Sequence, residues 1–203
     1  MKYIFGTKQK MTQLFDEKGV VIPVTAIQAG PIVLTQVKTL EADGYDALQF
    51  GFGTRKEKNI SRAQKGHFKD LGMFSHVRET RLNGDETEAK VGDKVTVDVF
   101  SEGDVVGVQS VSKSKGFQGV VKRHGFSGGP RTHGQKHNER SPGSIGAGGI
   151  QRVLKGIRMA GRMGGDTVSI KNVKIVKVDP VENIIYVKGA VPGRPGTLIE
   201  ITG

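Results

Sequence analysis

The chain of 203 residues contains no cysteine and no long hydrophobic run. Without cysteine it has no disulfides, no thiolate chemistry and no zinc site with cysteine ligands, which suits a reducing cytosol. No stretch approaches the ~20 consecutive apolar residues that a membrane-spanning helix needs. The first residues, Met1 to Gln13, lack the apolar core of a secretory signal peptide. These absences predict a soluble, cytoplasmic protein without a membrane segment.

Acidic residues are nearly missing from one internal segment, residues 113–165. The segment holds eleven Lys or Arg and a single acid, Glu139, so its net charge is +10, whereas the whole chain carries +11. It also holds 14 of the 30 glycines and three of the five histidines. Large apolar residues are sparse between Gly125 and Gly149, so this part cannot bury a core of its own. We expect a polyanion to order it, and nucleic acid is the first candidate.

The signatures of catalysis are also missing. Neither a G-x-x-x-x-G-K-[ST] phosphate loop nor a G-x-S-x-G elbow occurs in the chain. Glu139 has no second carboxylate in its segment with which to perform acid–base chemistry. His133 and His137 have a spacing that a metal site can use, but their Gly-, Asn- and Ser-rich surroundings favour RNA contact or plain exposure. The Gly51–Gly53 element is better explained as a turn or bulge. The sequence therefore predicts no enzyme, no cofactor and no metal site.

A β pattern is present on both sides of residues 113–165. Short runs rich in Val, Ile, Thr and Phe are bounded by turn signals at Asp16–Gly19, Ala29–Pro31 and Asp43–Gly44. The strict alternation of residues 94–100, KVTVDVF, is the clearest strand signal in the chain. Several short strands at a spacing of roughly ten residues favour a closed or nearly closed barrel.

The predicted organisation is mainly β. One β-barrel domain is expected to comprise residues 1–112 and 166–203, with a polar, helical insertion at about 54–72. Within the insertion, Ser61 is expected to cap a short helix from Arg62 to Leu71 that ends at Gly72. The remaining part, residues 113–165, is predicted to be a long, basic, largely irregular arm, because a connection of that length is usually functional or disordered.

The residue types of this arm suit RNA. Glycine allows backbone N–H groups to approach phosphates closely, and arginine offers a planar fork that binds phosphate and stacks on bases. From Arg152 to Arg162 apolar residues interleave with cations, which predicts a short helix or turn with a packing side and a phosphate side. The alternative is a solvated, disordered loop without a partner. The concentration of charge in so short a segment argues against it.

Five motifs stand in order along the chain: GTKQKMTQLF, ALQFGFGTRKEKNISRAQKGHF, SKSKGFQGVVKRHGFSGGPRTHG, SPGSIG and KGIRMAGRMGG. In this order they resemble the third protein of the large ribosomal subunit, in its bacterial form, over the whole length of the chain. The resemblance implies a six-stranded barrel of the type shared with translation elongation factors. It also implies an arm that enters the ribosomal RNA, with a tip at about 144–151 that approaches the peptidyl transferase centre.

The predicted function is therefore that of a structural constituent of the large ribosomal subunit. The resemblance implies direct binding of large-subunit (23S) ribosomal RNA early in assembly, and contact with neighbouring large-subunit proteins, but no membrane or small-molecule substrate. The predicted RNA-binding residues of the arm are Lys113, Lys115, Lys122, Arg123, His124, Arg131, His133, Lys136, His137, Arg140, Ser144, Gln151, Arg152, Lys155, Arg158 and Arg162. Those of the barrel domain are Lys8, Lys10, Arg55, Lys56, Lys58, Arg62 and Lys65.

Three alternatives remain open from the sequence. The basic stretch at residues 55–65 has an equally good explanation as a solvated helix face. An enzyme that holds a flavin or nucleotide in its barrel, as related barrels do, would show a pocket with convergent polar groups. A nucleic-acid-binding factor that acts outside the ribosome would use the same arm, because such an arm binds many RNAs.

Overall fold

The computed structural model describes residues 2–82 and 89–203. The chain divides into two compact units. The first, which we call the barrel unit, comprises Met1–Val111 and Thr167–Gly203. The second, which we call the basic unit, comprises Ser112–Asp166. The described part of the chain is mainly β with little helix, as predicted.

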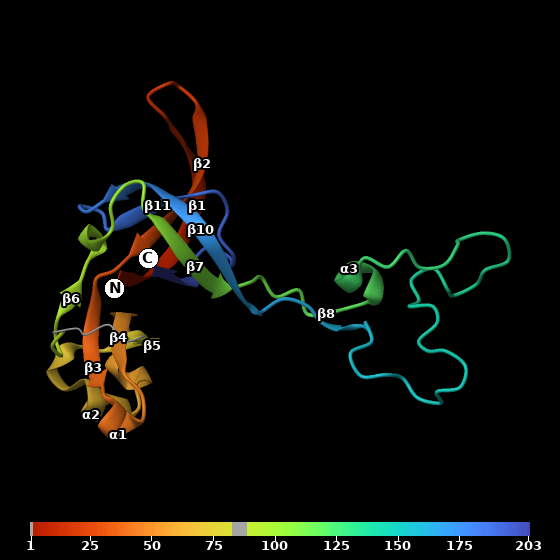
Figure 1. Cartoon of the computed structure of the whole chain (residues 1–203), viewed down its shortest axis with the longest axis horizontal. Helices are drawn as coiled ribbons and strands as arrows, with labels where there is room; N and C mark the ends of the chain where they lie inside the picture. Colours follow the sequence, from red (N-terminus) through yellow and green to blue (C-terminus); the bar gives the residue numbers. More distant parts are fainter. Residues whose placement is uncertain (1, 83–88) are drawn as a thin grey trace. The chain divides into compact units, whose positions relative to one another are not determined.

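Six antiparallel strands of the barrel unit form a closed barrel in the order β1-β12-β7-β10-β11-β2 (Figure 1). The predicted six-stranded barrel is thereby confirmed. Closure leaves no unpaired strand edge on this sheet. The strands are β1 (Tyr3–Phe15), β2 (Val21–Ala29), β7 (Val105–Val111), β10 (Thr167–Asp179), β11 (Ile184–Lys188) and β12 (Leu198–Thr202).

The barrel interior is filled by β-branched side chains that recur at every second position. On β12, Ile199 and Ile201 are fully buried, and their neighbours Leu198 and Glu200 are not. This is the period-2 pattern of a strand with one buried face. At the predicted Asp16–Gly19 turn, the Gly19 N–H donates to the Asp16 carbonyl at 2.8 Å and joins β1 to β2. The two apolar runs before that turn, YIFG and MTQLF, lie in one strand, β1, whose register against β2 shifts between Lys8 and Met11.

A second antiparallel sheet, in the order β5-β4-β3-β6, packs against the outside of β1. The ring of Tyr3 lies 5.7 Å from that of Phe50, and the ring of Phe5 lies 6.3 Å from that of Phe52, centroid to centroid. These aromatic contacts make the sheet and the barrel share one core. The strands are β3 (Ile32–Lys38), β4 (Ala47–Thr54), β5 (Phe74–Arg81) and β6 (Lys94–Val95).

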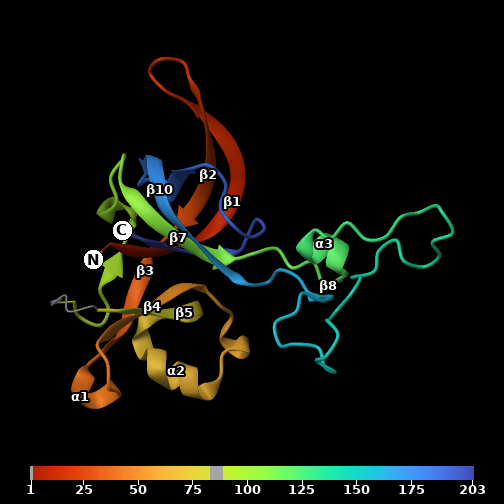
Figure 2. The same cartoon turned by 45° about the vertical axis from the view of Figure 1, so that its right-hand side comes forward.

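Short helices lie between strands of the second sheet, and the 3-10 turn η3 follows its strand β6 (Figure 2). The predicted cap of the longest, α2, is confirmed, since the Ser61 hydroxyl oxygen accepts the Gln64 N–H at 3.3 Å. This helix ends at Phe68, whose ring is buried, and a 3-10 turn η2 follows before Gly72. The helices are α1 (Leu40–Asp43), η1 (Glu57–Asn59), α2 (Arg62–Phe68), η2 (Lys69–Leu71) and η3 (Val97–Val99).

The predicted strand at residues 94–100 is wrong beyond its first two residues. β6 pairs with β3 only at Lys94 and Val95, and the 3-10 turn η3 follows. The turn buries Val97 and Phe100, three residues apart, on one side and leaves Val99 partly exposed. Burial at a spacing of three is what a 3-10 turn provides. The sequence NGDETEAKVGD, residues 83–93, predicts an acidic loop before this strand, and its residues 83–88 lie outside the described part of the chain.

The basic unit has little regular structure. It contains β8 (Phe117–Gln118), α3 (Val120–His124) and β9 (Gly161–Arg162), and α3 lies beside β8 in both views (Figures 1 and 2). The predicted helix or turn between Arg152 and Arg162 is a set of turns that leads into β9. Within the described residues, no helix of either unit is long and apolar enough to cross a membrane.

Candidate nucleic-acid interface

The two ends of the basic unit are joined by an antiparallel ladder, which we call the neck (residues 112–118 and 161–166). The Ser112 N–H donates to the Asp166 carbonyl and the Lys115 N–H to the Met163 carbonyl, both at 2.9 Å. The pairing continues into β8 and β9, where Phe117 lies opposite Arg162. Backbone hydrogen bonds therefore order the neck without any side-chain core.

The short helix α3 is fastened to the far end of the neck by two side chains. Arg123 donates from Nη1 to the Met159 carbonyl at 2.7 Å, and Nε2 of His124 lies 3.0 Å from the same oxygen. The Arg123 guanidinium occupies the space where a side chain at Gly161 would start, 2.7 Å from its Cβ position. Arg123 and His124 therefore hold the fold of the unit, which is a role that sequence reasoning did not assign to them.

The loop after α3 closes on itself through backbone contacts. The Gly129 N–H donates to the Asn138 carbonyl at 3.1 Å. Gly128 packs so tightly on the Glu139 carbonyl that a Cβ there would overlap it, and its φ of +75° also favours glycine. The Glu139 carboxylate accepts a hydrogen bond from Arg131 Nε at 2.6 Å. Both side chains are largely exposed, so this pair adds little stability.

The part of the basic unit from Ser144 to Arg158 is exposed at every position. Within these described residues the only side-chain hydrogen bond joins the Ser144 hydroxyl to the Gly146 carbonyl at 2.8 Å. Apolar side chains such as Ile150 and Leu154 are about half exposed. This segment therefore has no hydrophobic core of its own among the described residues.

The structure leaves most of the predicted arm residues open to solvent. Arg123 and His124 are half-buried, and the others are exposed: Lys113, Lys115, Lys122, Arg131, His133, Lys136, His137, Arg140, Ser144, Gln151, Arg152, Lys155, Arg158 and Arg162. Apart from the Arg131–Glu139 pair, no ion pair forms among the described residues of this unit. Their contact with RNA stays a prediction.

The predicted residues of the barrel unit divide into two groups. Lys8 is 9% exposed, and its Nζ donates to the carbonyls of Val191 at 2.6 Å and Gly193 at 2.9 Å. Its ammonium group binds backbone carbonyls inside the barrel unit, so Lys8 is not part of the proposed interface. Lys65 is half-buried and pairs with Glu57 at 2.9 Å, which lowers the pKa of that carboxyl. The exposed ones are Lys10, Arg55, Lys56, Lys58 and Arg62.

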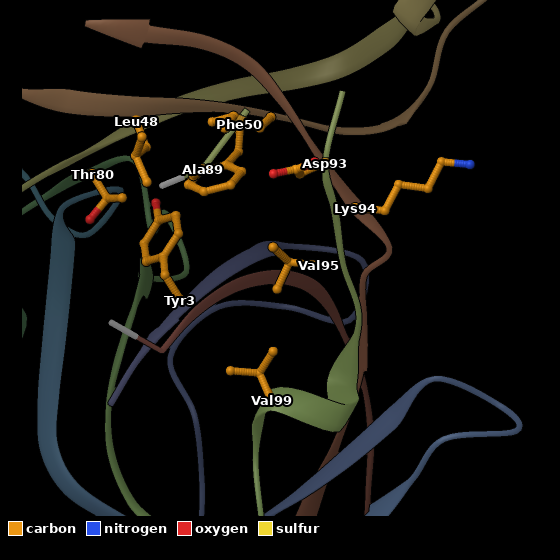
Figure 3. A pocket seen from close by; sticks show the side chains of 10 residues that line it. Tyr3, Leu48, Phe50, Thr80, Ala89, Asp93, Lys94, Val95 and Val99 are labelled. Atoms are coloured by element: carbon orange, nitrogen blue, oxygen red, sulfur yellow. The ribbon is translucent and has the colours of Figure 1, made fainter. Parts of the chain in front are cut away.

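One pocket of about 420 Å³ lies where β1 meets the second sheet (Figure 3). Its wall is mostly apolar, and the Tyr3 phenol, whose pKa is raised mainly by burial, stands in it beside Leu48 and Phe50. The side chain of Lys94 points away from the other lining residues in Figure 3. The described residues contain no cluster of three metal-ligating side chains. Among the described residues of this lining the polar members are Tyr3, Thr80, Asp93 and Lys94, and the remaining six are apolar. A nucleotide or flavin site needs polar groups that converge on the ligand.

Phe117 is a feature of the basic unit that sequence reasoning missed. Its ring is 76% exposed, although it belongs to the ordered neck. The signal available in the sequence was an aromatic residue within a run of lysines and glycines, KSKGFQG. Aromatic residues among cations are typical of surfaces that bind unpaired nucleotides.

Comparisons with known proteins place the chain in a family. The family model described as ribosomal protein L3 matches residues 75–182. The chain is 48% identical over 202 residues to the large ribosomal subunit protein uL3 of Thermosynechococcus vestitus, which covers 98% of this chain and 94% of the relative. It is 46% identical over 204 residues to the uL3 of Finegoldia magna, with 99% and 97% covered. With such similarity along nearly its full length, the chain belongs to the ribosomal protein L3 (uL3) family.

Proposed function

We propose that this chain is a structural constituent of the large ribosomal subunit and binds ribosomal RNA directly through its basic unit, the arm predicted from the sequence. The observation that carries the proposal is the set of exposed, unpaired cations in this unit. Among the described residues, the one ion pair of this unit is Arg131–Glu139, which neutralises one of eleven Lys and Arg side chains. The relatives at 46–48% identity are all called large ribosomal subunit proteins, which supports the same function here.

The chemistry of the arm fits phosphate binding. Unpaired guanidinium and ammonium groups release condensed counterions when they meet phosphates, which drives binding in a salt-dependent way. The exposed segment from Ser144 to Arg158 has the composition of a region that becomes ordered on its partner. We propose that the ordered neck fixes where this segment starts, and that its tip at 144–151 enters folded RNA and reaches toward the peptidyl transferase centre.

The exposed cations Lys10, Arg55, Lys56, Lys58 and Arg62 give the barrel unit a second candidate surface. No acid pairs with these five side chains among the described residues, in contrast to Lys65. We propose that they contact RNA or a neighbouring large-subunit protein from the outside of the subunit. Membership in the uL3 family makes the chain a non-enzymatic protein, as predicted.

The proposal is tested by removing charge from the arm. We expect Arg140→Gln, Arg152→Gln and Arg158→Gln together to weaken binding to protein-free large-subunit ribosomal RNA. Each lost phosphate contact should make the slope of log K against log salt less negative by roughly 0.7–0.9. The melting temperature should not change, because all three side chains are exposed and unpaired. Filter binding across a salt series and thermal melting measure the two effects.

A matched control removes three exposed lysines from the barrel unit: Lys18→Gln, Lys171→Gln and Lys188→Gln. The control lowers net charge by the same amount, so an equal loss of RNA affinity would contradict a specific role for the arm. Sedimentation of a cell lysate separates a subunit constituent from a free factor. Co-migration with the large subunit in high salt supports the first, and release at moderate salt supports the second.

A further inference from the structure

Phe117 is the most exposed large apolar side chain of the basic unit, at 76%. The other aromatic ring of this unit, Phe126, is half-buried and contacts His124 at 6.0 Å between ring centroids. An exposed phenyl ring in water costs free energy in proportion to its apolar area. Exposure alone does not single the ring out, since Phe15 and Val181 are also exposed, at 66% and 90%. The backbone and the cations around Phe117 do.

The backbone around Phe117 is held in place on both sides. The Met163 N–H donates to the carbonyl of Gly116 at 2.9 Å, and Gln118 lies opposite Gly161 in the ladder. On the other side α3 begins at once, and its first residue, Val120, is buried. The backbone that carries the exposed ring is thus already ordered. Binding of a ligand to the ring therefore costs less conformational entropy of the protein.

A cation accompanies the ring. Arg162 stands directly opposite Phe117 in the antiparallel ladder, and residues in this relation carry their side chains on the same face. The Arg162 guanidinium donates to the carbonyls of Gly164 at 3.3 Å and Gly165 at 2.9 Å, so its position is also fixed. Lys113 and Lys115 precede the ring in the chain, and both are exposed.

We propose that Phe117 is a stacking platform for one unpaired nucleobase, and that Arg162 binds the phosphate next to that base. This inference rests on the proposed function, since it names the part of the RNA that one position of the arm recognises. A flat apolar ring beside fixed and free cations matches a nucleotide, which combines a π-face with a phosphate. An apolar pocket of a protein would match the ring but not the positive charge around it.

The absence of tryptophan from the chain allows a direct test. Phe117→Trp in the full chain places a single indole on the proposed platform. The matched control is Phe15→Trp, because Phe15 is 66% exposed in the barrel unit and is followed by Asp16 and Glu17. We expect a single-stranded uridine oligonucleotide and protein-free large-subunit ribosomal RNA to quench the indole at position 117 strongly and the control little. A fully paired RNA duplex should quench it much less.

Affinity measurements on ring variants separate stacking from general apolar contact. Phe117→Tyr keeps a ring and should retain wild-type affinity for the single-stranded RNA. Phe117→Leu keeps an apolar side chain without a ring, and its affinity for the single-stranded RNA should fall about tenfold, which is typical of the loss of one stacked base. Neither variant should alter the slope of log K against log salt, because no charge changes.

The outcomes distinguish this inference from the proposed function. RNA binding by the wild-type chain, without quenching at position 117 and with full affinity for Phe117→Leu, would overturn the stacking platform and leave the proposed function standing. Quenching by large-subunit proteins but not by RNA would overturn it in favour of a protein contact. If the wild-type chain bound RNA no better than it binds a neutral polymer, both would fall.

Discussion

The barrel unit and the basic unit obtain their order from different sources. Nearly all of the buried apolar side chains lie in the barrel unit, and among them Ile4, Ile27 and Ile201 are 0% exposed. In the basic unit Val120 is the single buried hydrophobic side chain of the described residues. Its order comes from backbone ladders, glycine contacts and a few side-chain hydrogen bonds to carbonyls. One chain thus joins a unit that folds around a core to a unit that has almost no core of its own.

The charge distribution follows the same division. In the barrel unit Lys2, Lys38, Lys65 and Arg78 pair with carboxylates at distances from 2.5 to 3.3 Å. Among the described residues of the basic unit, Arg131 alone does so. Cations such as Lys10 and Arg55 of the barrel unit are also unpaired, but the acids of that unit nearly balance its charge, since residues 113–165 carry +10 of the chain's +11. A polyanion is attracted most strongly to the unit with the excess of positive charge. The division predicts that stability and RNA binding are separable properties of this chain.

Removal of the basic unit should give the largest effect. Val111 pairs with Thr167 across β7 and β10, so a two-residue Asn-Gly turn in place of Ser112–Asp166 would close a hairpin at this point. We expect the shortened chain to melt cooperatively near the wild-type temperature. Its affinity for large-subunit ribosomal RNA should fall at least about a hundredfold at physiological salt, because most of the net charge is lost.

Circular dichroism melting and filter binding measure these two properties on the same samples. Replacement of Ser112–Asp166 by a Gly-Ser linker of equal length is the matched control, since it preserves chain length and removes only the sequence. If either variant failed to fold, the barrel unit would depend on the basic unit for its core. If either kept most of its affinity, the cations of the barrel unit would be the main RNA contacts.

Lys8 and Lys10, two residues apart, test whether stability and RNA binding depend on different side chains. Lys8→Met leaves the buried carbonyls of Val191 and Gly193 without this donor, so we expect a loss of about 1–3 kcal/mol in the free energy of unfolding. Its RNA affinity should be unchanged. Lys10→Met removes an exposed charge, and we expect unchanged stability with a small loss of RNA affinity. Urea unfolding and filter binding decide the matter, and the reverse pattern would contradict the assignment.

Lys8 also shows where sequence reasoning ends. Local signals were reliable when their cause was local: the Asp16–Gly19 turn and the Ser61 cap depend on neighbouring residues and appear as predicted. The burial of Lys8 depends on carbonyls more than 180 residues further along the chain. No short window contains that information. The same limit explains why the sequence did not separate the strands of the barrel from those of the second sheet.

The structures of residues 94–100 and of Phe117 also depend on strand pairing that a local sequence pattern does not contain. The alternation of KVTVDVF is a strong strand pattern, yet pairing with β3 is available only for Lys94 and Val95, and Val97 with Phe100 then finds burial in a turn. Phe117 looks like an ordinary apolar residue of a short run, yet the ladder presents it to solvent. The charge and glycine content of residues 113–165 could be read from the sequence, because composition does not depend on contacts with distant residues.

Glu79 provides the smallest effect and the clearest dependence on pH. Hydrogen bonds from Lys38 and then from Tyr45 lower the pKa of its carboxyl from 4.5 to about 2. Its contribution to stability is therefore complete above pH 4.5 and is lost as the pH falls toward 2. Glu79→Gln should lower the free energy of unfolding by no more than about 1 kcal/mol at pH 7, because the pair is partly exposed. The difference from wild type should shrink toward zero near pH 2, while RNA affinity at pH 7 stays unchanged.

Urea unfolding at a series of pH values measures this difference. Glu57→Gln is the control, because the Glu57 side chain is 70% exposed in its pair with Lys65. A difference that grew on acidification would show that Glu79 stabilises the fold in its protonated form.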